Sequence, residues 1–260
     1  MTPRKKLIVG NWKMNLSVNE ASLYLHKLSD LIPVRRSVEV VLAPTLLALQ
    51  PLSLQVNRRQ FKLAIQNFYW RDNGAFTGEV SASQLQGIVE YAIIGHSERR
   101  YKFHETEKDI RNKVQAAVRN RIQPILCIGE TVGERSLGET NDVIRDQLMS
   151  GLANLTSDDL EMLVVAYEPV WAIGTGNNAK PSDVADAIKV IRDQIKQLYG
   201  AKPAEQVRVL YGGSITASSA ADYLAIKGVD GLLIGGASLD SREFSEIAIK
   251  AHTSEVAKKS

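Results

Sequence analysis

Eight short apolar segments recur along this chain at intervals of roughly 30 residues, and a longer amphipathic stretch follows each one. Their residues are aliphatic or β-branched on both faces, as expected of parallel strands that are buried on both sides. The segments are Leu7–Trp12, Val38–Ala43, Phe61–Gln66, Tyr91–Gly95, Ile122–Ile128, Met162–Tyr167, Val207–Tyr211 and Gly231–Gly235. This alternation predicts eight strand–helix units that share one parallel sheet.

The stretches between these segments show helical periodicity. In Asp183–Gln197, for example, charged residues lie on one face and Val, Ala, Ile and Leu on the other. The predicted helices are Ser17–Ile32, Thr106–Asn120, Asp142–Leu155, Ser182–Tyr199 and Ser241–Ala251. We therefore predict an α/β fold, a single-domain (β/α)8 TIM barrel over residues 1–260, a length that suits one such barrel. An open, doubly wound sheet is the alternative, because both folds repeat the same strand–helix unit.

Composition narrows the class of protein. The net charge is +3, and no basic cluster is interleaved with aromatic residues, so neither nucleic acid nor an acidic membrane is indicated as a partner. No apolar run approaches the ~18 residues of a spanning helix. The N-terminus enters a strand without a secretory or transit segment. Cys127 is the one cysteine, so no disulfide can form within the chain, which fits a reducing compartment. We expect a cytoplasmic protein.

A carboxylate ends the sixth apolar segment. Glu168 precedes Pro169, and a residue before proline is held away from the helical region. The apolar loop Pro169–Gly176 follows, with Trp171 inside it. A fixed carboxylate beside an apolar loop that ends in glycines suggests a base under a lid. The alternatives are an ordinary strand-to-helix connection with a solvated glutamate, and a buried salt-bridge partner.

Residues at the carboxyl ends of barrel strands face one common mouth. His96 follows the fourth segment and precedes a short helical turn, whose positive end favours the neutral imidazole. Neutral imidazole can donate a hydrogen bond to an oxygen on which charge develops. Lys13 and Asn11 end the first segment, where a cation can attract phosphate or stabilise an enediolate. A structural histidine and a solvated lysine are the alternatives.

Glycine pairs end the last two segments, in Gly212-Gly213-Ser214 and Gly235-Gly236. Barrels often bind phosphate on backbone N–H groups at these two ends, and glycine lets the backbone approach the anion. Gly174 can add an N–H group from the lid. Tight turns without a ligand are the alternative.

Other chemistries find little support. No Cys, His and Asp cluster has metal-ligand spacing, and no GxGxxG motif opens a nucleotide-binding fold. Cys127 is better explained as buried packing near Glu168 than as a nucleophile. We expect no metal and no cofactor.

Several motifs occur together in the order and spacing of triosephosphate isomerase, which this chain resembles from about Leu7 to about Ile249. They are Asn11-Trp-Lys-Met-Asn15, Ile94-Gly-His-Ser-Glu-Arg-Arg100, Cys127-Ile-Gly-Glu-Thr131, Ala166–Gly176, Tyr211-Gly-Gly-Ser214 and Leu233-Ile-Gly-Gly-Ala237. The resemblance implies an isomerase of glycolysis and gluconeogenesis. It interconverts dihydroxyacetone phosphate and D-glyceraldehyde 3-phosphate through an enediolate, without cofactor or metal.

The same resemblance implies roles for single residues. Glu168 is the base and His96 the electrophile. Lys13 and Asn11 hold the substrate and stabilise the enediolate. The phosphate accepts hydrogen bonds from the backbone of Gly174, Ser214, Gly235 and Gly236.

The connection Asn67–Ser83 is long and carries four aromatic residues, and an exposed apolar segment of this kind usually marks an interface. Gly74–Glu79 resembles the family's dimer loop. The resemblance implies a homodimer with Phe76, Thr77 and Glu79 at the interface, in which Thr77 reaches toward Asn11 and Lys13 of the partner subunit.

The chain departs from the family pattern at three places. Asn177-Asn178 stands at the far hinge of the lid, where a lysine–threonine pair is more usual. His104 stands where glycine is usual, so the family pattern does not predict the backbone conformation there. Thr253–Ser260 runs past the usual end of the fold, and we expect it to be a disordered tail.

Two further readings compete with an isomerase. The first is another phosphate-binding barrel enzyme. A metal-dependent sugar-phosphate epimerase needs two or more histidines at strand ends, and only His96 lies at one. A Schiff-base aldolase needs a lysine inside the barrel, and Lys13 is the only candidate at a strand end. A barrel retained for binding or structure is the other reading, and the presence of Glu168, His96 and Lys13 argues against it.

Overall fold

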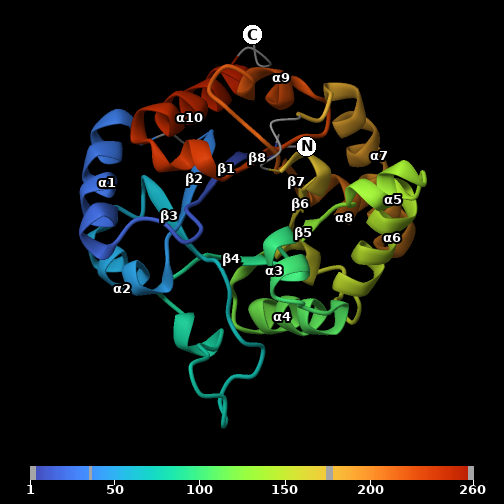
Figure 1. The fold of residues 1–260 in the computed structure, drawn as a ribbon, viewed down its shortest axis with the longest axis horizontal. Helices are drawn as coiled ribbons and strands as arrows, with labels where there is room; N and C mark the ends of the chain where they lie inside the picture. The colour runs from blue at the N-terminus through green and yellow to red at the C-terminus, as the bar shows by residue number, and fades with distance from the viewer. Residues whose placement is uncertain (1–3, 35–36, 174–177, 257–260) are drawn as a thin grey trace.

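The computed structural model describes residues 4–34, 37–173 and 178–256. Its eight strands are parallel and close into a barrel in chain order (Figure 1). The strands are β1 (Lys6–Asn11), β2 (Val38–Ala43), β3 (Phe61–Ile65), β4 (Tyr91–Ile94), β5 (Gln123–Ile128), β6 (Val164–Tyr167), β7 (Arg208–Tyr211) and β8 (Gly231–Ile234). All eight predicted strands are confirmed. Pairing of β1 with β8, with Leu7 opposite Gly231, closes the barrel and rules out the open sheet.

The helices form a ring around the barrel (Figure 1). They are α1 (Val18–Leu31), α2 (Leu46–Gln55), α3 (Ser97–Lys102), α4 (Glu107–Arg119), α5 (Val132–Ser136), α6 (Thr140–Gly151), α7 (Pro181–Tyr199), α8 (Ala201–Gln206), α9 (Ala220–Ala225) and α10 (Ser241–Val256). Short 3-10 turns are η1 (Ser83–Leu85), η2 (Asp159–Met162), η3 (Val170–Ala172) and η4 (Gly236–Leu239). The five predicted helices are confirmed as α1, α4, α6, α7 and α10.

Helix α10 extends further than the sequence pattern indicated. It continues to Val256, so it includes the first residues of the segment Thr253–Ser260 that we expected to be disordered. Residues 257–260 lie outside the described part of the chain.

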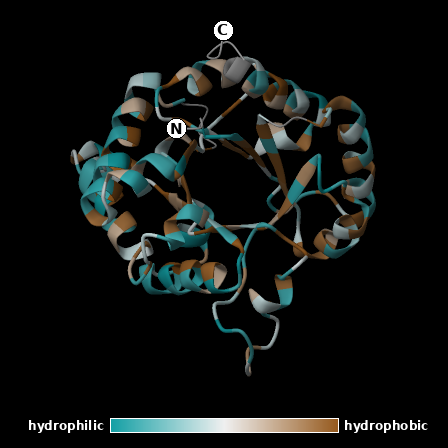
Figure 2. Ribbon diagram, turned by 180° about the vertical axis from the view of Figure 1, so that it is seen from behind, coloured by the Kyte–Doolittle hydropathy of each residue, from teal (hydrophilic) through white to brown (hydrophobic). Residues whose placement is uncertain are grey.

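The apolar core has two layers, which explains the unbroken apolar strands. Leu7 and Val9 point into the barrel, whereas Ile8 between them points toward the helices. Both layers are buried, and Figure 2 shows hydrophobic residues along the strands and recurring around the helices. Because each strand is covered on both faces, it has no polar face to expose.

Side-chain caps fix where several helices begin. Ser17 and Glu20 form a reciprocal capping box at the start of α1, and Thr131 and Glu134 form another at α5. Each box satisfies two N–H groups that the helix itself leaves unpaired. These polar pairs set the points at which the chain turns from strand to helix.

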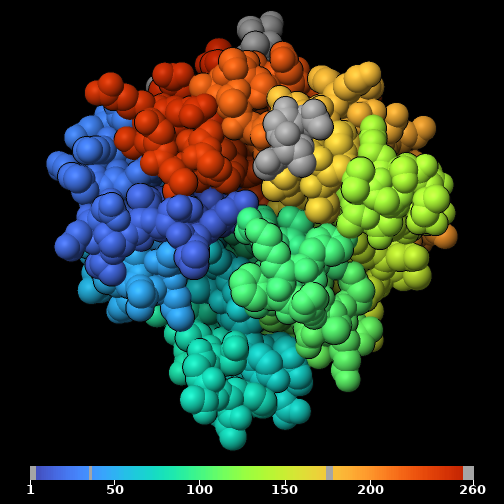
Figure 3. Space-filling view, in the orientation of Figure 1, coloured from blue at the N-terminus to red at the C-terminus, as the bar shows by residue number. Residues whose placement is uncertain are grey.

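The connection between β3 and β4 projects beyond the ring of helices (Figures 1 and 3). Phe68 at its base is buried, and the rings of Tyr69 and Phe76 lie 4.5 Å apart. Thr77 and Glu79 are exposed near its tip. Part of the apolar surface of this connection is therefore covered within the chain itself, because its aromatic residues pack on one another. No helix within the described ranges is long and apolar enough to cross a membrane.

Candidate active site

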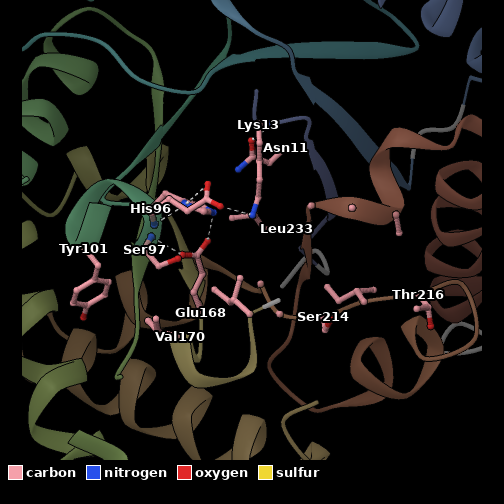
Figure 4. A pocket seen from close by; sticks show the side chains of 18 of the residues that line it. Asn11, Lys13, His96, Ser97, Tyr101, Glu168, Val170, Ser214, Thr216 and Leu233 are labelled. Atoms are coloured by element: carbon pink, nitrogen blue, oxygen red, sulfur yellow. Dashed lines mark hydrogen bonds and ion pairs between the residues drawn. The ribbon is translucent and has the colours of Figure 1, made fainter. Parts of the chain in front are cut away.

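The carboxyl ends of the strands surround a pocket of about 680 Å³ (Figures 3 and 4). Every predicted substrate-site residue within the described chain lines it, namely Asn11, Lys13, His96, Glu168, Ser214, Gly235 and Gly236. The barrel thus brings together residues from β1, β4, β6, β7 and β8. Gly174, which we also predicted here, lies outside the described residues.

Glu168 is almost completely buried, with 2% of its surface exposed. Its N–H group donates to the carbonyl of Ile128 at 2.7 Å, which extends the β5–β6 ladder by one residue. Its Oε2 accepts a hydrogen bond from the Ser97 N–H at 3.1 Å, and Oε1 lies 3.4 Å from His96 Nε2. Gly212 makes room for this side chain, because a Cβ there would lie 3.0 Å from the Glu168 Cγ.

His96 is the N-cap of α3, as its position before the predicted helical turn suggested. Its Nδ1 accepts a hydrogen bond from the Glu98 N–H at 3.2 Å. When Nδ1 accepts this bond, the proton of a neutral ring is on Nε2. Nε2 faces the nearby Glu168 carboxylate (Figure 4). The local fold therefore directs the Nε2 side of the ring toward the pocket.

Lys13 has a left-handed backbone, with a φ of 53°. This conformation is uncommon for a residue with a side chain and persists only where its surroundings enforce it. Here the Lys13 N–H donates to Asn11 Oδ1 at 3.1 Å, and Gln66 Nε2 donates to the Lys13 carbonyl at 2.9 Å. These bonds hold the Lys13 side chain toward the pocket.

Glu98 lines the pocket and was missed by the sequence analysis. Its Oε1 lies 2.9 Å from Lys13 Nζ. Burial raises the pKa of Glu98, but the hydrogen bond and charge of Lys13, together with His96 and Lys102, outweigh it and hold the pKa below its ordinary value. The sequence places Glu98 in the first turn after His96, yet nothing in that spacing reveals its partner.

The side of the pocket away from Glu168 and His96 is formed by backbone groups. Gly235 and Gly236 follow β8, and the first N–H groups of a helical turn such as η4 have no partner within the turn. Ser238 is buried and anchors this turn, since its Oγ donates to the Gly235 carbonyl at 2.6 Å and its carbonyl accepts from Tyr24 at 2.6 Å. The Lys13 side chain lies against Gly235, where a Cβ would be 3.3 Å from the Lys13 Cε.

The start of the predicted lid is held by Glu130, a fully buried carboxylate. Its oxygens accept hydrogen bonds from Trp171 Nε1 at 2.8 Å and from the Tyr167 hydroxyl at 3.1 Å. The Arg135 guanidinium lies 4.1 Å from the centre of the Trp171 ring. Residues 174–177 of the lid, including Asn177 of its hinge, lie outside the described chain.

Cys127 packs inside the barrel and is fully buried. Burial, with the nearby Glu168 carboxylate, raises the pKa of its thiol well above the ordinary value. Such a thiol is a poor nucleophile, in agreement with the packing role that we expected. In the described ranges no group of three or more His, Cys, Asp or Glu side chains could hold a metal ion.

The other histidines lie away from the pocket. His104 has a φ of 55°, so the position where the family more often has glycine is a left-handed one. His26 and His104 are exposed, whereas His252 is half-buried and its Nδ1 lies 2.5 Å from Ser37 Oγ. This contact arises because α10 packs on the residue that precedes β2.

A closed parallel barrel with a buried carboxylate, an imidazole and an ammonium group around one pocket defines the class of (β/α)8-barrel enzymes. Comparison with known proteins narrows the class. A family model described as triosephosphate isomerase matches residues 6–251. The chain is 41% identical over 245 residues to the triosephosphate isomerase of Clostridium botulinum (strain Eklund 17B / Type B), which covers 94% of this chain and 98% of that protein.

Two other relatives agree. The triosephosphate isomerase of Chloroherpeton thalassium (strain ATCC 35110 / GB-78) is 42% identical over 249 residues, with 94% of this chain and 98% of that protein covered. That of Caldanaerobacter subterraneus subsp. tengcongensis is 40% identical over 245 residues, with the same coverage. The chain belongs to the triosephosphate isomerase family.

Proposed function

We propose that this protein interconverts dihydroxyacetone phosphate and D-glyceraldehyde 3-phosphate, as a step of glycolysis and gluconeogenesis. The observation that carries the proposal is the buried Glu168 carboxylate, whose Oε1 lies 3.4 Å from Nε2 of His96. A base and a neutral hydrogen-bond donor at this spacing can act on the carbon and the oxygen of one carbonyl substrate. Membership of the family supports the same reaction.

In the proposed mechanism Glu168 removes a proton from the carbon next to the substrate carbonyl. The electrons of the broken C–H bond form the carbon–carbon double bond of an enediolate, and negative charge moves to the carbonyl oxygen. His96 Nε2–H donates to the substrate oxygens, and the Lys13 ammonium stabilises their charge. A proton passes from the hydroxyl oxygen to the former carbonyl oxygen, next to His96 Nε2, so that the two oxygens exchange their roles. Glu168 returns its proton to the neighbouring carbon, which completes the isomerisation.

The resting contacts of two groups must change when substrate binds. The Glu168 Oε2 accepts a hydrogen bond from the Ser97 N–H, and the Lys13 ammonium is paired with Glu98. We infer that Glu168 leaves Ser97 to face the substrate carbon, and that Lys13 shares its charge between Glu98 and the substrate. Asn11, which accepts the Lys13 N–H, holds that lysine in place.

The phosphate is assigned to the backbone side of the pocket. Ser214, Gly235 and Gly236 lie there, and their N–H groups would donate to the phosphate oxygens, joined by Gly174 from outside the described residues. The neighbouring Lys13 adds positive charge. This arrangement leaves the two reacting carbons on the Glu168 and His96 side.

The reaction calls for no external electron carrier, since the ketose and the aldose are isomers and differ only in the position of two hydrogens. We therefore propose that Glu168, His96 and Lys13 perform it without a cofactor or metal. We also propose a cytoplasmic location, in agreement with the free thiol of Cys127.

We propose further that the protein is a homodimer. Met14, on the loop after β1, and Leu47, at the start of α2, are 94% and 81% exposed, and contact with a second copy would cover these large apolar side chains. The projecting loop with Phe76, Thr77 and Glu79 fits the role of an arm that docks on a second copy. In a two-fold dimer Thr77 would lie near Asn11 and Lys13 of the partner subunit.

The test is a turnover assay on the purified protein. We expect isomerisation of D-glyceraldehyde 3-phosphate at the same rate with and without a chelator, and almost none in the Glu168→Gln variant, which is isosteric but not basic. Absence of turnover in the folded wild-type protein, or loss of it with the chelator, would contradict the proposed function.

A further inference from the structure

Gln147 of α6 is a buried side chain that lies outside the pocket but is bonded to the chain behind it. The Gly129 N–H donates to Gln147 Oε1 at 2.8 Å, and Gln147 Nε2 donates to the Gly129 carbonyl at 3.3 Å. One amide therefore engages both polar groups of one backbone residue. The two bonds also fix the orientation of the amide, because a flipped amide would face donor to donor and acceptor to acceptor.

The position of Gly129 explains why such a partner is needed. The β5–β6 ladder ends with Ile128 opposite Tyr167, so Gly129 lies just beyond the sheet. Its N–H and C=O groups are in the protein interior, where unpaired backbone groups are strongly unfavourable. Gln147 replaces the missing strand partner.

Gly129 in turn lies directly against the backbone of Glu168. A Cβ on Gly129 would be 1.8 Å from the Glu168 carbonyl oxygen, so only glycine permits this approach. The residues on either side of Gly129 are bonded to the same segment: the Ile128 carbonyl accepts from the Glu168 N–H at 2.7 Å, and the Glu130 carbonyl accepts from the Val170 N–H at 3.0 Å. A shift of Gly129 would therefore shift the backbone that carries the base.

Helix α6 provides a rigid base for this contact. Gly151, one turn after Gln147, packs so closely on β5 that a Cβ there would lie 2.7 Å from Leu126 Cδ2. The amide thus connects a helix that is tightly packed on β5 to the end of that strand.

We propose that Gln147 is a positioning residue that holds the Gly129 backbone and thereby sets the place of Glu168 relative to the substrate carbon. The inference rests on the proposed function, because it assigns Gln147 to the proton transfer that Glu168 carries out. Gln147 touches neither the substrate nor the phosphate side of the pocket. Its effect should therefore appear in the chemical step rather than in substrate binding.

The test compares Gln147→Met, which keeps the length of the side chain but removes both hydrogen bonds, with Gln115→Met as a matched control. Gln115 is half-buried on α4 and also donates to a backbone carbonyl, that of Ala153 at 2.9 Å, away from the pocket. We expect Gln147→Met to lower kcat by about tenfold or more, since a misplacement of about 1 Å can lower a rate a hundredfold.

Three readouts separate positioning from a general loss of structure. In Gln147→Met the KM and the inhibition constant of glycerol 3-phosphate should stay within twofold of wild type. The deuterium isotope effect at the abstracted hydrogen should rise, because proton transfer becomes slower than the other steps. Gln115→Met should resemble wild type in all three. If Gln147→Met does not fold, Gln147→Asn serves instead, since it withdraws the amide by one methylene.

A folded Gln147 variant with wild-type kcat and isotope effect would overturn the inference. So would a loss of kcat that is matched by an equal weakening of glycerol 3-phosphate binding, which would indicate a structural role alone. A wild-type protein without turnover is a separate result: it would refute the proposed function, and the role of Gln147 with it.

Discussion

Lys13 Nζ and Glu98 Oε1 lie 2.9 Å apart at the mouth of the pocket, although 85 positions separate these residues in the sequence. Both side chains are about one-third exposed, at 29% and 32%. Burial raises the pKa of Glu98. The hydrogen bond and charge of Lys13, with smaller contributions from other groups, outweigh this effect, so the pKa lies below its ordinary value. Glu98 is therefore an anion at neutral pH and competes with an anionic substrate for Lys13.

Replacing Glu98 by glutamine should lower kcat by about tenfold or more, because the charge that orients the Lys13 ammonium is lost. Steady-state kinetics will measure the effect. Glu90→Gln is a matched control, since Glu90 pairs with Arg58 at 2.8 Å and precedes β4, at the other end of the barrel. An unchanged kcat in Glu98→Gln would exclude a role for the ion pair in catalysis.

The stabilisation from the Lys13–Glu98 pair should disappear in acid. The folded pKa of Glu98 is depressed, so the contribution is complete above the ordinary value of 4.5 and is lost as pH falls through the lower folded value. For a partly exposed pair we expect at most about 1 kcal/mol. The difference in melting temperature between wild type and Glu98→Gln should shrink below pH 4.5, and a difference that grows there would contradict this assignment.

Glu168→Asp should keep the negative charge but withdraw the carboxylate by one methylene, roughly 1 Å, and lower kcat about a hundredfold. Inhibition by glycerol 3-phosphate should change little, since the phosphate is assigned to the other side of the pocket. Near-normal turnover in this variant would remove Glu168 from the role of base.

Lys13→Met should abolish most activity without unfolding the barrel. The ammonium is assigned to the stabilisation of the enediolate, and its partner Glu98 is already partly exposed to water, so little stability depends on the pair. Thermal melts of wild type and Lys13→Met should nearly coincide, whereas turnover should be far lower in Lys13→Met. A fall in melting temperature that accounts for the lost activity would make Lys13 structural.

Removing the projecting part of the connection between Asn67 and Glu79 should give a folded monomer that has lost most of its activity. In the proposed dimer this loop supports Asn11 and Lys13 of the partner subunit, and Lys13 has a left-handed backbone that depends on its surroundings. Light scattering on dilute wild-type and loop-shortened protein, together with turnover, will test this. A fully active wild-type monomer would refute both the interface and the support of Lys13.

The sequence by itself was sufficient for the eight strands and for the polar residues that end them. A strand buried on both faces has to be apolar throughout, so each one is visible as an unbroken run with a sharp end. Glu168, His96 and Lys13 are found next to those ends because chain continuity alone places them there. Helix α2 was missed for the converse reason: its leucines are spread over several faces, with Leu47 and Leu54 exposed, so that it shows no helical periodicity.

Only the tertiary structure decided closure of the barrel, the pairing of Lys13 with Glu98 and the clamp of Gln147 on Gly129. Closure depends on whether β1 meets β8, and the same strand–helix pattern is compatible with an open sheet. The two side-chain contacts depend on how α3 and α6 are rotated and seated on the barrel. That placement comes from packing between residues far apart in the sequence, so no local pattern of amino acids contains it.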